Sequence, residues 1–190
     1  MPNDTARDFT GSTATAPAPN AVPGNAGPAA PAFIGTGSGL DLDHVDRRIL
    51  DILQRDARTS NAEIARQVGL TSSAIFQRVR KLEESGVIRG YTTILDPPRL
   101  GYGLVAFIMV RTGENVRTRD TIEPLLLIPE VQEIHRVIGE DCFLVKVRVA
   151  DTAALAHLLD ERIQPIPSVA STRTTIVLQT ARESLNLPIR

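Results

Sequence analysis

Residues 71 to 81 place hydroxyl and amide side chains ahead of a group of cationic ones, with no acid among them. Hydroxyl and amide groups hydrogen-bond to the edges of nucleic acid bases, and Arg and Lys side chains bind phosphates or guanine. The candidate contacts are Thr71, Ser72, Ser73, Phe76, Gln77, Arg78, Arg80 and Lys81. For Phe76, packing on a neighbouring helix is the favoured role and contact with a thymine methyl group the alternative. The segment is suited to bind a polyanion.

An amphipathic helix must present these side chains. Ile75, Val79 and Leu82 recur at the spacing of the buried stripe of an α-helix. Thr71 can cap this helix by accepting hydrogen bonds from the backbone N–H groups of its first turn. From Arg66 to Lys81 there are four basic residues and no acid, although the whole chain carries a formal net charge of -1. The basic outer face is therefore a local electrostatic feature.

Two further helical patterns precede this one. A first helix is indicated by apolar residues at helical spacing, namely Leu42, Val45, Ile49, Ile52 and Leu53. A second helix starts after a cap at Ser60 or Asn61 and ends at Gly69, which can adopt the left-handed conformation of a tight turn. Ala65 is small where two helices must approach closely, and Leu70 is expected to fill the corner. The pattern predicts a helix-turn-helix.

Two alternatives to DNA binding by these helices stay open. One is a small helical bundle whose cationic face is merely solvated, because short motifs produce false positives. The other is a module that docks another protein, against which the basic face argues.

Residues 101–181 alternate between strand and helix signals. Strands are predicted at residues 104–110, 131–138, 143–149 and 172–178, with helical stretches ending in residues 122–128 and covering 151–163. This β-α-β-β-α-β order predicts an α+β, ferredoxin-like fold whose helices cover one face of an antiparallel sheet. Residues 104–110 contain no polar side chain, so both faces of this strand favour burial. We expect a second copy of the sheet to cover the other face; the alternative is a central strand with a modestly exposed back.

The rest of the chain divides by composition. Residues 1–39 consist mainly of small and polar residues and Pro and are predicted to form a disordered tail; a partner-binding arm at residues 32–34 is the alternative. Residues 40–92 form the helix-turn-helix domain, in which residues 87–95 are extended and form a small ribbon. Residues 93–100 are a linker and residues 182–190 a C-terminal tail. No signal peptide or membrane-spanning stretch is found, so a soluble, cytoplasmic protein is expected.

No constellation of residues typical of an enzyme occurs. His44, His135 and His157 are isolated, there is no Gly-rich phosphate loop, and carboxylates do not recur at metal-ligand spacing. Cys142 is the only cysteine, which excludes an internal disulfide and a Cys-based zinc site. We expect no catalytic residue, no metal and no cofactor.

Several motifs together, in order and spacing, resemble the Lrp/AsnC, or feast/famine, family of transcription regulators. They are LDHVDRRILDILQRDAR, the helix-turn-helix, EESGVIRGYTTILDPPRLG, VIGEDCFLVKV and TRTTIVL, and the resemblance covers about residues 40–180. It implies a winged helix-turn-helix that binds double-stranded DNA and a C-terminal RAM domain that dimerises through its sheet and often assembles into octamers. It also implies a small effector, commonly an amino acid, near the loop joining the second and third strands.

In this chain that loop contains Gly139, Glu140, Asp141 and Cys142. Gly139 matches the family's glycine, whereas many members carry an aspartate where this chain has Cys142. The acids could receive an ammonium group while backbone N–H groups bind a carboxylate; a plain polar hairpin turn is the alternative. The sirohaem decarboxylases resemble the family in fold and use His and Arg residues, so His135 and Arg136 keep an enzymatic alternative open.

Overall fold

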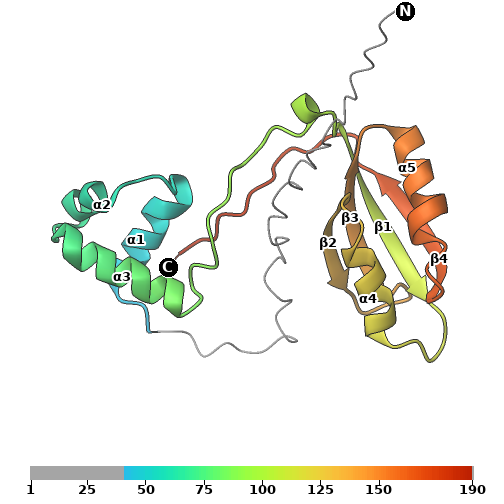
Figure 1. Ribbon diagram of the computed structural model, residues 1–190, viewed down its shortest axis with the longest axis horizontal. Helices are drawn as coiled ribbons and strands as arrows, with labels where there is room; N and C mark the ends of the chain where they lie inside the picture. The colour runs from blue at the N-terminus through green and yellow to red at the C-terminus, as the bar shows by residue number, and fades with distance from the viewer. Residues whose placement is uncertain (1–40, 190) are drawn as a thin grey trace, which may run out of the picture. The chain divides into compact units, whose positions relative to one another are not determined.

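The computed structural model describes residues 41–189, and the chain divides into two compact units between Gly90 and Tyr91. The first unit contains helices α1 (His44–Arg55), α2 (Asn61–Val68) and α3 (Ser72–Glu84) (Figure 1). The tail predicted at residues 1–39, including the possible arm at residues 32–34, lies outside the described residues.

Each of the three helices begins at a side-chain cap. The side chains of Asp43, Ser60 and Thr71 accept backbone N–H groups of α1, α2 and α3, respectively. Gly69 ends α2 with φ at 73°, the left-handed conformation that was predicted. The sequence left Ser60 and Asn61 open as the cap of α2, and the structure uses Ser60.

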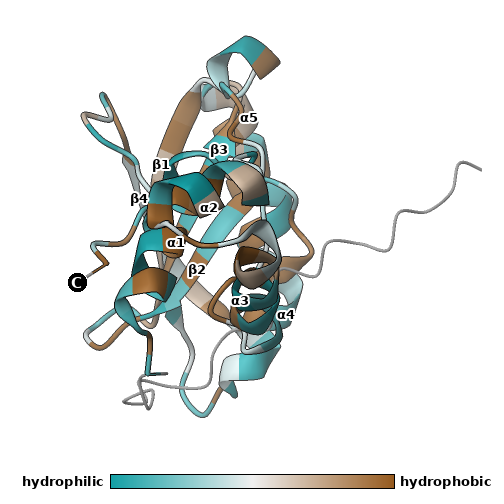
Figure 2. Cartoon of the chain, turned by 90° about the vertical axis from the view of Figure 1, so that its left-hand side faces the viewer, coloured by the Kyte–Doolittle hydropathy of each residue, from teal (hydrophilic) through white to brown (hydrophobic). Residues whose placement is uncertain are grey.

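The helices bury one stripe each against a shared core. Hydrophobic and hydrophilic residues are interleaved along α3 (Figure 2), and its buried residues are Ile75 and Leu82. They pack with Val45, Ile49, Ile52, Ile64 and Ala65. Ala65 lies in this core as expected, whereas Leu70 stays 39% exposed and fills the corner only in part.

The segment after α3 differs from its prediction. Residues 87–95 contain no strand, and the small ribbon expected there is not present in the described part of the chain. Val87 and Ile88 pack on the helical core, but Ile94 is 89% exposed. An extended segment becomes a strand only when it finds a hydrogen-bonding partner, which single-sequence patterns do not reveal. A 3-10 turn, η1 (Pro98–Leu100), follows.

The second unit has the predicted β-α-β-β-α-β order. Its elements are β1 (Leu104–Thr112), α4 (Thr118–Leu126), β2 (Val131–Arg136), β3 (Phe143–Val149), α5 (Thr152–Leu158), the π-helical turn η2 (Leu159–Ile163) and β4 (Val169–Ile176). The strands form one sheet in the order β2-β3-β1-β4, and every neighbouring pair is antiparallel. The last strand starts at Val169, earlier than predicted, because a register shift after Arg111 lets Thr112 pair with Val169.

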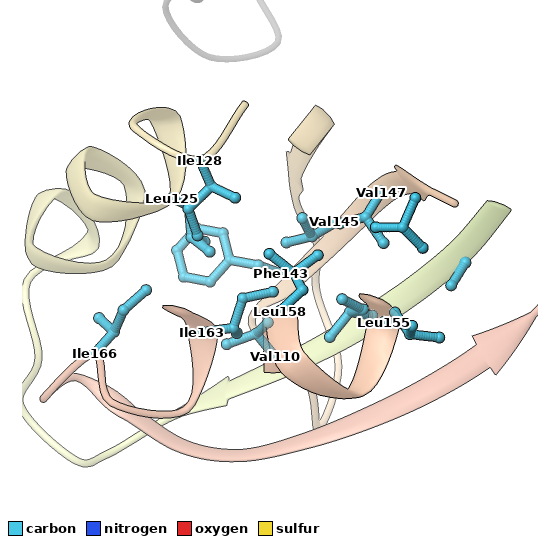
Figure 3. Close-up of a cluster of buried hydrophobic side chains, with 13 residues drawn as sticks. Val110, Leu125, Ile128, Phe143, Val145, Val147, Leu155, Leu158, Ile163 and Ile166 are labelled. Carbon is cyan, nitrogen blue, oxygen red and sulfur yellow. The ribbon is translucent and has the colours of Figure 1, made fainter. Parts of the chain in front are cut away.

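Alternate residues of the central strands point to opposite faces of the sheet. On the helix side, Ala106, Ile108 and Val110 of β1 are fully buried. Phe143, Val145 and Val147 of β3 lie on the same side and contact the core residues of α4 and α5 (Figure 3). The sheet and its two helices thus form one hydrophobic core.

The opposite face, here called the outer face, carries the intervening residues of the strands. Phe107 of β1 lies there between Lys146 of β3 and Thr175 of β4, and the next row joins Leu144, Met109 and Arg173. Phe107, Met109 and Leu144 remain partly exposed. The C-terminal segment reaches this face, where Glu183 forms ion pairs with Lys146 and with Arg148. Within residues 91–189, no helix packs against the outer face.

Candidate nucleic-acid interface and effector loop

Seven of the eight predicted DNA contacts are exposed at the start of α3 or along it, and Ser73, Gln77, Arg80 and Lys81 lie on the side opposite its buried residues. The seven exposed residues are Thr71, Ser72, Ser73, Phe76, Gln77, Arg80 and Lys81. Phe76 is 50% exposed, so it is available at the surface instead of being buried in the helical core. Among residues 41–189, no hydrogen bond or ion pair engages the side chain of Gln77 or Lys81. Their polar groups are available to a ligand without breaking an internal contact.

The first turn of α3 is organised by Thr71. Its hydroxyl accepts the backbone N–H of Ala74 at 3.2 Å and lies 3.1 Å from the hydroxyl of Ser73. The cap sets the direction of the first turn, where Ser72 and Ser73 stand beside the remaining backbone N–H groups. A helix start of this kind favours a phosphate group, because the N–H groups and the helix dipole both attract negative charge.

The cations of this surface differ in how far they are already neutralised. Arg80 contacts Glu84 at 2.7 Å, with both side chains more than half exposed, and Arg66 pairs with Glu63. Exposed pairs on one helix contribute little free energy, so a phosphate can replace the carboxylate. The sequence contains no acid between Arg66 and Lys81, but Glu63 and Glu84 lie just outside this segment and pair with Arg66 and Arg80. The unpaired positive charge of the segment is therefore smaller than its count of basic residues indicates.

Arg78 is the exception among the predicted contacts. Its side chain is only 33% exposed, and its guanidinium lies 2.7 Å from a carboxylate oxygen of Asp43 and 2.7 Å from one of Asp46. The hydrogen bonds that Arg78 donates to these two carboxylates, first Asp43 and then Asp46, raise its pKa. The backbone N–H of Asp46, followed by Arg78, lowers the pKa of Asp43. Arg78 thus ties α3 to the start of α1 and orients the helix that carries the other contacts.

We expect the substitution Arg78→Met to lower the stability of the helical unit by about 1 kcal/mol, or about 5 °C in melting temperature. The estimate is small because solvent screens a partly exposed pair. The depressed pKa of Asp43 means that its stabilisation is present above pH about 4 and is lost as pH falls through the folded-state value. The difference between the two proteins, measured by thermal melting, should therefore shrink in acid. An equal difference at every pH would contradict this role.

The loop between β2 and β3 contains the predicted effector residues. The backbone N–H of Cys142 donates to the carbonyl of Val110 at 2.9 Å, and the N–H of Val137 donates to the carbonyl of Cys142 at 3.0 Å. Gly139 has φ at 149°, outside the range that other residues favour. The loop is a hairpin connection whose base is held to β1.

Two of the four predicted effector residues already have polar partners. Asp141 accepts a hydrogen bond from Arg173 at 2.6 Å, and the thiol of Cys142 lies 3.2 Å from the hydroxyl of Thr112. The hydrogen bond with Thr112 lowers the pKa of the Cys142 thiol. Glu140 is exposed, and no described residue pairs with its carboxylate. Sequence reasoning missed Arg173 of β4 and Thr112 of β1. Strand pairing in the sheet brings these two residues beside the loop, although they are distant from it in the chain.

The geometry does not support a tetrapyrrole site at His135 and Arg136. The two residues are adjacent in β2, so their side chains point to opposite faces of the sheet. His135 lies on the outer face and contacts Glu133 at 3.0 Å. Within residues 41–189, no three His, Cys, Asp or Glu side chains lie close enough together to hold a metal ion. Over the same residues, no helix is long and apolar enough to cross a membrane.

Comparison with known proteins assigns each of the two units to a known domain family. Residues 42–89 match the model of a winged helix-turn-helix DNA-binding domain, and residues 105–187 match that of the Lrp/AsnC ligand binding domain. The HTH-type transcriptional regulator FL11 of Pyrococcus horikoshii is 40% identical over 151 residues, which cover 80% of this chain and 99% of the relative. The chain belongs to the Lrp/AsnC family of transcriptional regulators.

Other Lrp/AsnC proteins agree over the same region. The leucine-responsive regulatory protein of Escherichia coli is 38% identical over 156 residues, covering 80% of this chain and 94% of the relative. The structure of a transcriptional regulator from Neisseria meningitidis in complex with L-methionine superimposes with a TM-score of 0.74 and 28% identity, over 77% of this chain and 96% of that one. The predicted fold, a winged helix-turn-helix followed by a ferredoxin-like domain, is confirmed.

The family also confirms the predicted function. The chain is a DNA-binding transcriptional regulator with an effector-binding domain. The exact domain limits, at residues 39, 92, 100 and 181, and the individual contact residues remain predictions.

Proposed function

We propose that this Lrp/AsnC regulator acts as a symmetric homo-oligomer in which paired copies of α3 read a pseudo-palindromic DNA site, under the control of an amino acid. The observation that carries the proposal is the exposed side of α3, where Gln77, Arg80 and Lys81 lie opposite the buried Ile75 and Leu82. A helix anchored in this way can enter the major groove with its polar side toward the bases.

The outer face of the sheet supports the dimer. Phe107, Met109 and Leu144 lie in its centre, are partly exposed, and are not covered by a helix of their own unit. A two-fold axis through this face would pack the apolar centres of two sheets against each other. Further assembly of dimers, for example into octamers, is part of the proposal, because the family often assembles in this way.

The loop at residues 139–142 is the proposed place of the effector. An ammonium group can be received by Glu140 without breaking an internal contact, whereas Asp141 would have to exchange Arg173 for the ligand. Two relatives are named for leucine or were solved with L-methionine, which supports an amino acid as the effector. In this proposal the protein acts only by binding DNA and the effector, without a catalytic residue, metal or cofactor. Its proposed location is the cytoplasm.

We expect DNase footprinting to show a protected site with two-fold sequence symmetry. Two recognition helices of a dimer that read one side of the duplex require half-sites spaced by one helical turn of about 10 bp or a multiple of it. The site can first be found by sequencing genomic DNA bound to the protein, with and without a panel of amino acids. A footprint without a two-fold relation would contradict the symmetric arrangement.

A further inference from the structure

The C-terminal segment after β4 returns to the outer face of the sheet. The N–H of Val177 still donates to the carbonyl of Val105 at 2.9 Å, so the chain leaves β4 beside the start of β1. Glu183 then forms ion pairs with Lys146 and with Arg148, two outer-face residues of β3. The segment therefore crosses from β4 over β1 to β3, which are neighbours in the sheet.

The segment does not seal the part of the sheet that it crosses. A cavity of about 490 Å³ lies between the two, lined on the sheet side by Phe107, Lys146 and Arg148 and on the other side by residues 179–183. Phe107 stays partly exposed under the segment. The apolar centre of the outer face is thus left open to the second copy of the sheet in the proposed dimer.

Lys146 and Arg148 place two cations side by side on this face. Each side chain is only 12% exposed, whereas Glu183 is half exposed. Glu133 of β2 also pairs with Lys146, at 3.0 Å. Arg148 lies 3.1 Å from Glu183 and also donates to the neutral amide of Gln132 at 3.3 Å. Two carboxylates therefore balance two cations, and Glu183 is the carboxylate that pairs with both.

The ionisation of this cluster makes its burial costly. Burial by itself would lower the pKa of Lys146, but hydrogen bonds to Glu183 and Glu133 raise it above its ordinary value. The hydrogen bond from Lys146 lowers the pKa of Glu183. A second sheet packed about 10 Å away would remove water from these charges. A desolvated cation is unfavourable unless a counter-ion stays with it.

We propose that Glu183 is the counter-ion that allows a second copy to cover Lys146 and Arg148, so that the C-terminal segment is part of the dimer interface. Without Glu183, the cluster would contain two cations and one anion, and the two-fold axis would bring two such clusters to one interface. Like charges in an interface with little water oppose association. The inference rests on the proposed dimer and names the residue that makes its charged part compatible with burial.

The test is sedimentation velocity of the full-length protein over a dilution series. We expect Glu183→Gln, which keeps the shape of the side chain but not its charge, to raise the Kd of the dimer at least about tenfold. The double variant Lys146→Met and Glu183→Gln leaves one cation, Arg148, and one anion, Glu133. It should recover most of the lost affinity, and Lys146→Met alone completes the cycle of variants.

Glu161→Gln is the matched control. Glu161 is exposed on η2, on the helix side of the sheet, so this variant loses the same charge away from the outer face and should leave the Kd unchanged. Thermal melting should show that Glu183→Gln remains folded, since Glu183 lies outside the hydrophobic core. If Glu183→Gln did not fold, the double variant would still have to fold and form dimers.

Two outcomes would overturn this inference and leave the proposed function intact. One is a native dimer whose Kd is unchanged by Glu183→Gln; the other is a loss of affinity that the double variant does not recover. A native protein that sediments as a single subunit at every concentration would overturn the proposed dimer as well, and a footprint with two-fold symmetry would then not be expected.

Discussion

Replacing Phe107 with lysine is expected to separate the protein into single subunits and to lower its affinity for its DNA site by about 10²- to 10⁴-fold. Phe107 lies in the centre of the outer face, directly beside Lys146. A second copy packed on this face would have to bury the new ammonium group next to a like charge, which is costly. Without the dimer, the two copies of α3 bind DNA independently and the gain from simultaneous binding is lost.

Sedimentation velocity would measure the subunit association, and electrophoretic mobility shift would measure the DNA affinity. Gln164→Lys is a matched control, because it adds the same charge at an exposed position next to η2, on the helix side of the sheet. Thermal melting should show that the second unit remains folded in both variants, since Phe107 does not belong to its buried core. If the Phe107→Lys protein stays dimeric and binds DNA normally, the dimer interface does not lie on the outer face.

The substitutions Gln77→Ala and Arg80→Ala are expected to weaken binding to the specific site by about 1 to 3 kcal/mol each, and binding to unrelated DNA much less. Gln77 has no polar partner in residues 41–189, and Arg80 has only the exposed Glu84. Removing either side chain therefore removes few internal contacts. The measured loss of affinity for the specific site should therefore report the loss of a contact between the side chain and a base.

Lys81→Ala provides the comparison for these two variants. Lys81 follows Arg80 on the same exposed side of α3, where an ammonium group is suited to phosphate. We expect Lys81→Ala to weaken binding to all sequences about equally and to reduce the dependence of log K on log salt by about 1. An equal loss on all sequences for Gln77→Ala or Arg80→Ala would reassign that residue to the phosphate backbone.

The elements of this protein could be predicted from the sequence because their causes are local. The caps at Ser60 and Thr71 and the left-handed turn at Gly69 depend on residues within four positions of each other. The buried stripe of α3 follows from the periodicity of Ile75, Val79 and Leu82. The exposed side of α3, with Gln77 and Lys81, follows from the same periodicity. Strand type and order followed from alternation and from the handedness of crossovers.

Only the tertiary structure decided which charged groups are free, because ion pairs form between residues that are distant in the chain. Arg78 appeared equivalent to Arg80 in the sequence, but it pairs with Asp43 and Asp46, more than 30 residues away. Asp141 is likewise held by Arg173 through the register of the sheet.

The limits of the strands also depend on the tertiary structure. Strand β4 extends back to Val169 because Thr112 of β1 pairs with it. Residues 87–95 form no ribbon because no strand in the described part of the chain pairs with them. Periodicity and caps report on neighbours along the chain, whereas pairing and burial depend on neighbours in space.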